Sequence, residues 1–218
     1  MLFFSLFQEP IVFISFIVAL VVAISFHEFA HAWAAHRFGD PTPKYMGRLS
    51  LNPLVHMDFI GTIFLFIAGF GWGKPVLYNP NNLRGKWDEV KIALAGPITN
   101  IILAFVFAIP YRIGYLASVD PSVLTTSPFH IFFNVLVELN IVLAVFNLLP
   151  IPPLDGSKII YLFVDSKTRY FLDRAGMPIL FLILFLAYVL NWDIFGKILF
   201  YPIVWLQYLV KIFPFGLI

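Results

Sequence analysis

Three residues in segment 26–37 have side chains and spacing that suit a metal site. His27 and His31 are four residues apart, so a helix places both imidazoles on one face, one turn apart. Two ring nitrogens at that spacing can bind one zinc ion at about 2.0–2.1 Å. Glu28 follows His27 directly, where its carboxylate can accept a proton from a zinc-bound water. The pattern HExxH therefore predicts a hydrolytic zinc centre; the alternative is two histidines hydrogen-bonded inside a helix bundle.

The composition indicates that this motif lies in an integral membrane protein. Of the 218 residues, 61% are hydrophobic and 12% are charged, whereas a soluble domain carries about 25% charged residues. The chain has no cysteine, which leaves histidines and carboxylates as the metal ligands. A net charge of +2 without a basic, aromatic-rich cluster argues against a nucleic-acid partner. The N-terminus lacks the basic start of a signal peptide, so we expect the first helix to be retained.

The hydrophobic pattern predicts an all-α polytopic membrane protein with about five to six transmembrane helices. Residues 53–72 contain an apolar core of only about 12 residues, a length typical of a re-entrant element. The loop that follows, residues 71–87, contains two prolines and is expected to form a β-hairpin with a surface segment. We expect one domain, residues 1–218, with a core over about 11–163 and C-terminal helices over about 175–213. The expected spans are residues 11–38, 88–116, 126–149, 175–190 and 194–212.

The distribution of lysine and arginine predicts the orientation of these spans. If the N-terminus is outside and residues 53–72 do not cross, 12 of the 14 basic residues lie on the inner side. Only Arg112 and Lys197 then lie outside. The first span ends on the inner side with its HExxH motif, so the metal centre is expected to face the cytosol.

A catalytic zinc site needs a third protein ligand and an open position for water. Asp155 follows the inner end of the span at 126–149, which is the end of the bundle where His31 lies. The prolines before it can turn its carboxylate back toward the bundle. We therefore predict that Asp155 is the third ligand, and its alternative role is a helix N-cap. Other candidates are Glu138, His56, Asp58, His36 and His130.

Two asparagines in the same span are candidates for substrate contact. Asn140 and Asn147 are seven residues apart and share one helical face. Amides at membrane depth are expected to have hydrogen-bond partners. They could hold an extended peptide backbone or donate to a developing oxyanion. Hydrogen bonds between helices fit the sequence equally well.

Three segments, in order, resemble the signature segments of the site-2 protease family of intramembrane zinc metalloproteases. They are HEFAH (27–31), ALAGPITN (93–100) and FNLLPIPPLDG (146–156), and the resemblance covers about residues 11–163. Segment GRLSLNP (47–53) is similar to the compact, prokaryotic-type branch, in which a PDZ or CBS module is absent. No such module is expected in a chain of this length.

The resemblance implies one zinc ion per chain, bound by His27, His31 and Asp155, with Glu28 as general base. It implies that Asn147 holds substrate, and that the substrate is a transmembrane protein cleaved within the lipid bilayer of a prokaryotic cell membrane. Two other functions share these residues. A membrane zinc carrier could use the same ligands for transport, and a scaffold could retain the fold without catalysis. The sequence does not predict an oligomeric state.

Overall fold

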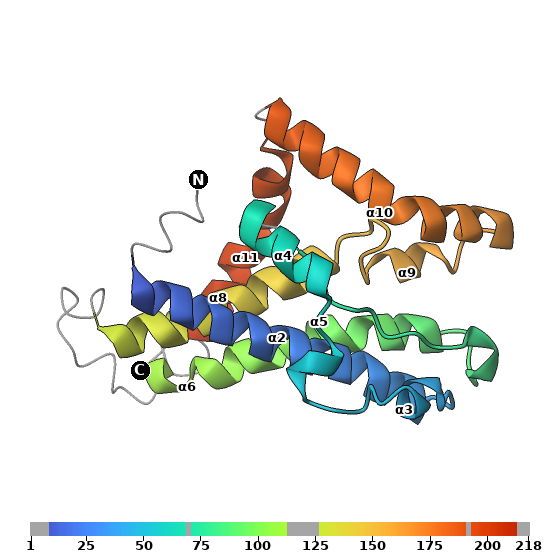
Figure 1. Cartoon of the computed structure of the whole chain (residues 1–218), viewed down its shortest axis with the longest axis horizontal. Coiled ribbons are helices and arrows are strands. Elements are labelled where there is room, and N and C mark those ends of the chain that lie inside the picture. Colours follow the sequence, from blue (N-terminus) through green and yellow to red (C-terminus); the bar gives the residue numbers. More distant parts are fainter. Residues whose placement is uncertain (1–8, 69–70, 113–126, 191–192, 213–218) are drawn as a thin grey trace.

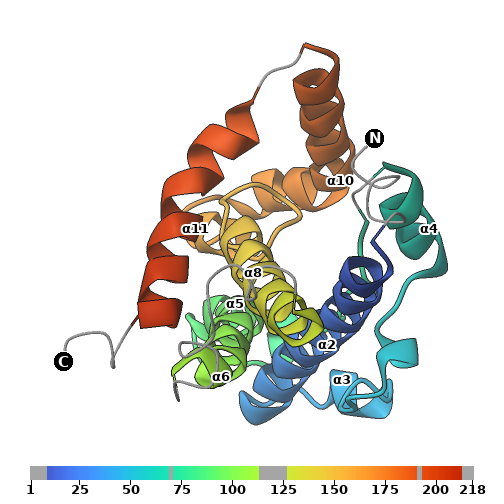
Figure 2. The ribbon, with the colours of Figure 1, turned by 90° about the vertical axis from the view of Figure 1, so that its left-hand side faces the viewer.

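The core of the molecule is a bundle of three long helices. The computed structural model describes residues 9–68, 71–112, 127–190 and 193–212. Helices α2 (Pro10–Arg37), α5 (Asp88–Phe107) and α8 (Pro128–Asn147) pack against one another pairwise, as Figures 1 and 2 show. Helix α11 (Ile194–Ile212) packs on α8. Helix α10 (Ser166–Val189) extends away from the three-helix bundle.

Small side chains allow these helices to pack closely. Along α2 a stripe of buried residues recurs at every fourth position, so it lies on one face of the helix. Most of its members are alanine or serine, which let helix backbones approach in a membrane. The two motif histidines occupy the later positions of the same stripe and therefore face the bundle interior. The stripe consists of Ser15, Ala19, Ala23, His27, His31 and Ala35.

Four helices have the length and hydropathy of a membrane span, and one shorter helix is apolar. The four are α2, α5, α8 and the part of α10 from Ser166 to Ala187, and the shorter one is Gly196–Val210 within α11. This agrees with the predicted all-α polytopic architecture. The span expected at 88–116 is divided, because α5 ends at Phe107 and the short helix α6 (Ile109–Arg112) follows. Its predicted last residues, 113–116, lie outside the described residues.

The segment between α2 and α5 contains the short element expected from the sequence, but it contains no hairpin among its described residues. Helix α4 (Phe59–Ala68) has 10 residues and rises about 15 Å, half of the hydrocarbon thickness of about 30 Å. Residues 71–79 form neither a helix nor a regular strand, and their pairing among the described residues is limited to one antiparallel bridge between Met57 and Gly73. The predicted β-hairpin is thus not observed in this segment.

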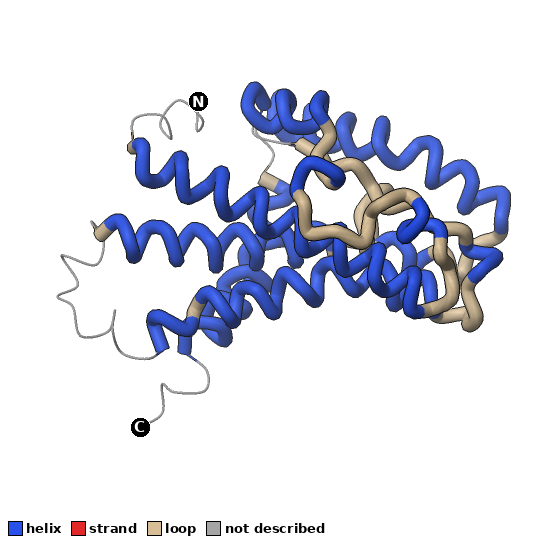
Figure 3. Tube along the Cα trace, turned by 60° about the horizontal axis from the view of Figure 1, so that its bottom comes forward, coloured by secondary structure: helices blue, strands red, loops and turns tan. Residues whose placement is uncertain are grey.

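The reason lies in the residues available to pair with this segment. The sequence over 45–51 has strand-forming side chains, yet Tyr45 ends helix α3 (Thr42–Tyr45) and Gly47 has a φ of 71°. A left-handed residue interrupts a strand. The chain then turns through helices η1 (Pro53–Val55) and η2 (Pro80–Asn82) on either side of α4 and residues 71–79. Figure 3 shows these connections as loop around short helices.

Asp40, three residues beyond the end of α2, links the loop that contains Thr42 to the loop that contains Asn79 and Asn82. Its carboxylate is fully buried and accepts hydrogen bonds from Thr42 Oγ1 and Asn82 Nδ2, both at 2.7 Å. It also accepts from the backbone N–H of Asn79 at 2.7 Å. Burial alone would raise the pKa of Asp40, but the hydrogen bonds from Asn82 and Thr42 outweigh it and lower the pKa. The ionised carboxylate therefore stabilises the fold.

Replacing Asp40 with asparagine is expected to lower the free energy of unfolding by about 1–3 kcal/mol, because an acceptor of several buried donors is lost. Since the folded pKa lies below the ordinary value of 3.8, this stabilisation is complete above that value and is lost as the pH falls through the folded pKa. Thermal unfolding of both proteins in detergent, between pH 7 and pH 3, measures the difference. A difference in melting temperature that persists unchanged at the lowest pH contradicts the assignment.

Candidate metal centre

His27, His31 and Asp155 meet at one point in the helix bundle. The Nε2 atoms of the two histidines are 3.0 Å apart. Asp155 Oδ2 lies 3.2 Å from Nε2 of His27 and 3.3 Å from Nε2 of His31. Ligands of a tetrahedral zinc ion with bonds of about 2.0–2.1 Å are separated by about 3.3 Å. The three atoms therefore have the spacing of one face of a zinc coordination tetrahedron, and this triad is the candidate metal group among the described residues.

The turn after α8 directs Asp155 toward the histidines. The α-helix stops at Asn147, before the prolines, and the N–H of Gly156 donates to the carbonyl of Asn147 at 2.7 Å. A Cβ atom on Gly156 would lie 2.2 Å from the carbonyl oxygen of Leu148, so this close return of the chain requires glycine. Asp155 does not cap the following helix α9 (Ser157–Ile160), because no side chain caps that helix. The alternative role considered for Asp155 is thus not observed.

The electrostatics of Asp155 also suit a metal ligand. Oδ2 is buried and has no hydrogen-bond partner besides its approach to the two imidazoles. Burial alone would raise the pKa of Asp155, but the neighbouring His31 and His27 lower it below its usual range. A buried, ionised oxygen between two ring nitrogens is an incomplete arrangement that a divalent cation completes, because buried charges are paired or coordinate metals.

Helix α5 fixes the orientation of both imidazoles. His27 Nδ1 lies 2.6 Å from Asn100 Oδ1, and His31 Nδ1 lies 2.7 Å from the carbonyl oxygen of Ile92. Both partners are acceptors, so each Nδ1 carries the proton and each Nε2 is left free to bind a metal. This arrangement, with the second ring nitrogen donating to an oxygen, is the usual one for histidines that bind zinc.

Asn100 is held in turn by the other two core helices. Its Nδ2 donates to the carbonyl of Ala23 on α2 at 3.2 Å and to Oδ1 of Asn140 on α8 at 2.9 Å. Asn140 Nδ2 donates to the carbonyl of Leu136 at 2.8 Å. Both asparagines are completely buried. This chain of hydrogen bonds assigns the direction of each amide and links the metal-binding face of α2 to α5 and α8.

Replacing Asn100 with leucine, a side chain of similar size, is expected to weaken zinc binding about 10–100-fold. His27 would lose the acceptor that fixes its tautomer and ring orientation. Asn140→Leu is the matched control, because it removes an amide from the same chain of hydrogen bonds without touching the imidazole, and its effect on zinc binding is expected to be smaller. Competition with a chromophoric chelator in detergent measures both affinities. Equal affinities in wild type and Asn100→Leu would contradict this role.

Gly96 provides the space that the two imidazoles occupy. A Cβ atom at this position would lie 2.4 Å from His31 Nε2 and 2.6 Å from His27 Nε2. Both distances are below van der Waals contact, so no other residue fits beside the metal-binding atoms without moving them. Segment 93–100 carries part of the family resemblance, but its sequence did not indicate that one of its small residues borders the metal group.

Glu28 lies one position beyond His27 and is partly exposed. Gly73 lies close to this side chain, because an added Cβ there would lie 3.7 Å from Glu28 Oε1. The carboxylate has no hydrogen-bond partner among the residues that the structure describes. It is therefore accessible from the side on which Gly73 lies.

The other candidates for the third ligand lie elsewhere, and none joins the described metal group. His56 is fully buried, with Nε2 at 2.6 Å from the carbonyl of Ser50. Asp58 accepts a hydrogen bond from the N–H of Gly61 in the first turn of α4. Glu138 accepts a hydrogen bond from Asn134 on its own helix, one turn away. His36 and His130 are likewise outside the metal group.

The two asparagines proposed for substrate contact differ in their surroundings. Asn140 is completely buried in the hydrogen-bond chain behind His27. Asn147 is partly buried at the end of α8, and its Nδ2 donates to the carbonyl of Leu143 at 3.0 Å in its own helix. A local bond of this kind can be exchanged for a ligand. Of the two, Asn147 is the one whose amide is not buried in this chain of hydrogen bonds, and its role in substrate contact stays a prediction.

Together, a bundle of membrane-spanning helices and a metal group formed by the two HExxH histidines of α2 and by Asp155 from the turn after α8 define a membrane-embedded zinc hydrolase. The model of Peptidase family M50 matches residues 15–117 and 112–190. The chain is 38% identical over 174 residues to YwhC of Bacillus subtilis, covering 78% of this chain and 80% of that protein. It is 33% identical over 200 residues to Rip2 of Mycobacterium tuberculosis strain H37Rv, covering 86% of this chain and 72% of that protein.

A third relative, MJ0611 of Methanocaldococcus jannaschii, is 29% identical over 192 residues, covering 84% of this chain and 83% of that protein. All three carry names that assign them to the zinc metalloproteases. No solved structure matches the chain. The chain belongs to Peptidase family M50, as its resemblance to the site-2 proteases indicated. It is a zinc metalloprotease with membrane-spanning helices.

Proposed function

We propose that the chain is an intramembrane endopeptidase that hydrolyses peptide bonds within or beside transmembrane segments of other membrane proteins. The observation that carries this proposal is the position of the metal group on a membrane-spanning helix. His31 lies six residues before the end of α2 at Arg37, and His27 lies ten residues before it. At 1.5 Å per residue, these positions are about 9 Å and 15 Å from the helix end. A soluble peptide would have to enter the bilayer to reach them.

In the proposed reaction, Glu28 accepts a proton from the attacking water and later delivers it to the leaving amine. A zinc ion bound by His27, His31 and Asp155 would supply Lewis acidity toward the water and the scissile carbonyl. Asn147 donates an amide hydrogen to the developing oxyanion. The small-residue packing of α2, α5 and α8 holds these groups in place before substrate arrives.

The substrate must be extended at the scissile bond, because a helix hides its carbonyls in hydrogen bonds to the residue four positions on. Residues 73–78 belong to no helix or regular strand, and Gly73 already forms an antiparallel bridge, so this segment is suited to pair with such a chain by strand addition. Arg48, which is almost completely buried, holds this segment: Nη2 donates to the carbonyls of Lys74 at 3.1 Å and Pro75 at 3.0 Å. Its Nη1 donates to the carbonyl of Val55. Segment 45–51 is less suited to this pairing, because Tyr45 ends α3 and Gly47 has a φ of 71°.

Replacing Val76 with proline is expected to reduce cleavage of a transmembrane reporter about 10-fold or more, because the backbone N–H available to a paired substrate is removed. Leu54, an exposed residue of η1, provides the matched control as Leu54→Ala. Zinc content of both variants, measured after purification, reports whether the metal group is preserved. Unchanged cleavage by Val76→Pro would remove the strand-addition step while leaving the protease assignment intact.

We further propose that the active site faces the cytosolic side of a prokaryotic cell membrane. Twelve of the 14 lysine and arginine residues support this orientation when α4 does not cross the bilayer. Attachment of a maleimide reagent to single cysteines introduced at Lys44 and at Lys197, in intact cells, tests it. Labelling of the Lys44 position from outside the cell would reverse the orientation.

The decisive test of the proposed activity uses the purified chain in vesicles with a single-span reporter. We expect cleavage within or beside the reporter's transmembrane segment, loss of cleavage on removal of metal by a chelator, and recovery on addition of one equivalent of zinc. Mass spectrometry of the products locates the bond. Cleavage restricted to soluble loops, or cleavage that survives metal removal, would overturn the proposal.

A further inference from the structure

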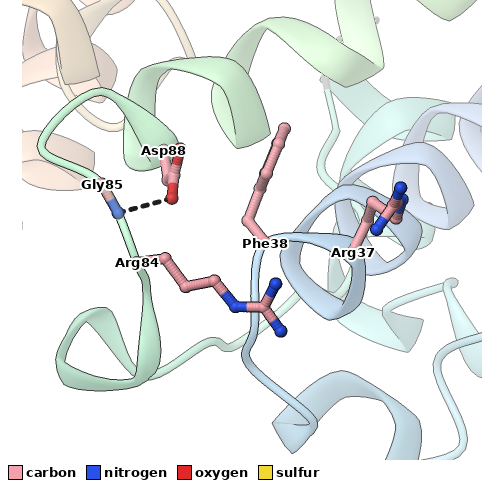
Figure 4. A pocket seen from close by; sticks show the side chains of 5 residues that line it. All are labelled: Arg37, Phe38, Arg84, Gly85 and Asp88. Carbon is pink, nitrogen blue, oxygen red and sulfur yellow. Dashed lines mark hydrogen bonds between the residues drawn. The ribbon is translucent and has the colours of Figure 1, made fainter.

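A cavity of about 460 Å³ lies at the end of the bundle where α2 ends and α5 begins. It is lined by Arg37, the last residue of α2, by Phe38, and by Arg84, Gly85 and Asp88 from the loop before α5 and its first residue. Figure 4 shows Arg84 reaching from its loop toward the end of α2, with Arg37 on α2 itself. Both arginines thus line one cavity, although their positions are 47 apart in the chain.

The two arginines have no anionic partner within the part of the chain that the structure describes. No ion pair or side-chain hydrogen bond involves either guanidinium. Asp88, the acidic residue of the lining, already accepts from the N–H of Gly85 at 2.7 Å and from Lys91 Nζ at 2.9 Å. Lys91 also lies over the ring of Phe38, 5.1 Å from its centre. The cavity and this adjoining lysine therefore carry two positive charges in excess.

Arg84 is also held in position. Gly39 has a φ of 116°, and a Cβ there would lie 3.1 Å from Arg84 Nε and 3.3 Å from Arg84 Cγ. The stem of the arginine therefore lies against the backbone of Gly39. An arginine whose stem is packed loses less conformational entropy when its head binds a ligand.

The position of the cavity indicates where its ligand comes from. It lies at the ends of two membrane-spanning helices, α2 and α5, and hence at the membrane surface. Trp33, on α2 before Arg37, and Trp87, directly before Asp88, are 54% and 55% exposed. Trp33 is one turn before Arg37 on the same face of α2. Exposed tryptophans are typical of the headgroup level of a bilayer, and basic pockets between membrane helices bind anionic headgroups.

We propose that this cavity binds the phosphate group of an anionic phospholipid, with Arg37 and Arg84 as its two ligands. Arginine presents a planar fork of donors that matches phosphate oxygens, and two such forks from different elements can hold one headgroup. The bound lipid bridges the end of the metal-bearing helix and the loop that leads into α5. This site is separate from the metal centre and does not depend on the proposed proteolytic substrate.

The test measures the preference of the site for anionic lipid. Purified protein is reconstituted in phosphatidylcholine vesicles that contain increasing fractions of brominated phosphatidylglycerol or brominated phosphatidylcholine. Bromine quenches tryptophan fluorescence at short range, and Trp33 and Trp87 each lie within four positions of a residue that lines the cavity. For the wild type we expect the relative binding constant to favour phosphatidylglycerol about 30-fold, since two basic residues near the surface contribute about 1 kcal/mol each. For the double variant R37Q/R84Q we expect nearly no preference.

Two controls separate the cavity from general surface charge and from arginine chemistry. The variant K44Q/K167Q removes the same charge from exposed lysines outside the cavity and is expected to keep the preference. The variant R37K/R84K keeps the charge but loses the planar fork, and is expected to show an intermediate value. Zinc content, measured for every variant, verifies that the bundle is folded.

Three results would overturn the proposal. Preference for phosphatidylglycerol that survives in R37Q/R84Q would show that the lipid binds elsewhere. Equal loss of preference in R37Q/R84Q and K44Q/K167Q would show that only net surface charge matters. Abolition of the preference by millimolar inorganic phosphate or glycerol phosphate in the wild type would identify the ligand as a soluble anion. Loss in R37Q/R84Q alone, with no competition by soluble phosphate, supports the lipid site.

Discussion

Replacing Glu28 with glutamine is expected to reduce cleavage of a transmembrane reporter by about 10²–10⁴-fold, the contribution of a positioned general base. Zinc content is expected to stay at one ion per chain. Glutamine has nearly the same size as glutamate, and Glu28 is not among the three residues that form the metal group. The amide cannot accept the proton of the attacking water, so catalysis is lost while the site remains assembled.

Measurement of zinc and cleavage on the same preparations distinguishes the functions that share these ligands. A zinc carrier would transport metal in vesicles equally well in wild type and Glu28→Gln, because the metal ligands are unchanged. A matched control is Glu9→Gln, which makes the same chemical change at the exposed position before α2. Cleavage by Glu28→Gln at the wild-type rate would contradict the role of Glu28. Zinc binding by wild type and Glu28→Gln without cleavage by either of them would contradict the proposed activity.

The metal ligands could be predicted from the sequence because two different physical constraints apply to them. His27 and His31 follow from helical periodicity, which depends on local spacing alone. Asp155 follows from topology: the third core helix must end on the side where the HExxH helix ends, and prolines there turn the chain. The structure brings the three together within 3.3 Å. A catalytic zinc site needs three protein ligands, so a third residue had to lie near the two histidines. Topology alone therefore ranked Asp155 above the other candidates for that ligand.

The residues that support these ligands could not be predicted in the same way. Asn100 and Gly96 lie about 70 residues from His27, and their roles depend on the rotation of α5 against α2. Packing of small side chains sets the rotation of a helix about its axis. Where apolar residues surround the helix on every side, sequence periodicity does not specify that rotation. A buried amide in such a helix signals that a partner exists, but it does not identify the partner.

The predicted hairpin is not observed, for a related reason. The prolines in residues 71–87 indicate turns, which is a local preference, whereas the conformation of the loop follows from what it must contact. Asp40 and Arg48 are buried and bind backbone and side-chain groups from Thr42 to Asn82. Because the buried groups of Asp40 and Arg48 need hydrogen-bond partners, the chain turns at Gly47. Residues 73–78 then lie without a regular strand partner. Buried polar groups outweigh weak strand propensity.

Replacing Gly96 with alanine is expected to lower zinc affinity by about 100-fold or more, and to reduce proteolysis in proportion. The added Cβ would occupy a point 2.4 Å from His31 Nε2. Either α5 moves away or both imidazoles turn from the metal position, and the hydrogen bonds of His27 to Asn100 and His31 to Ile92 are strained in each case. The effect of a single methyl group is large because the contact is with the ligand atoms themselves.

This prediction separates metal binding from folding, because the same substitution favours the helix. Alanine is a better helix former than glycine by about 1 kcal/mol, so metal-free Gly96→Ala is expected to remain helical by circular dichroism. Ala95→Ser, which adds one atom to the neighbouring residue of α5, is the matched control and is expected to bind zinc as the wild type does. Zinc affinity measured by chelator competition provides the comparison. Normal affinity in Gly96→Ala would mean that the imidazoles do not occupy the position beside α5 on which the metal centre depends.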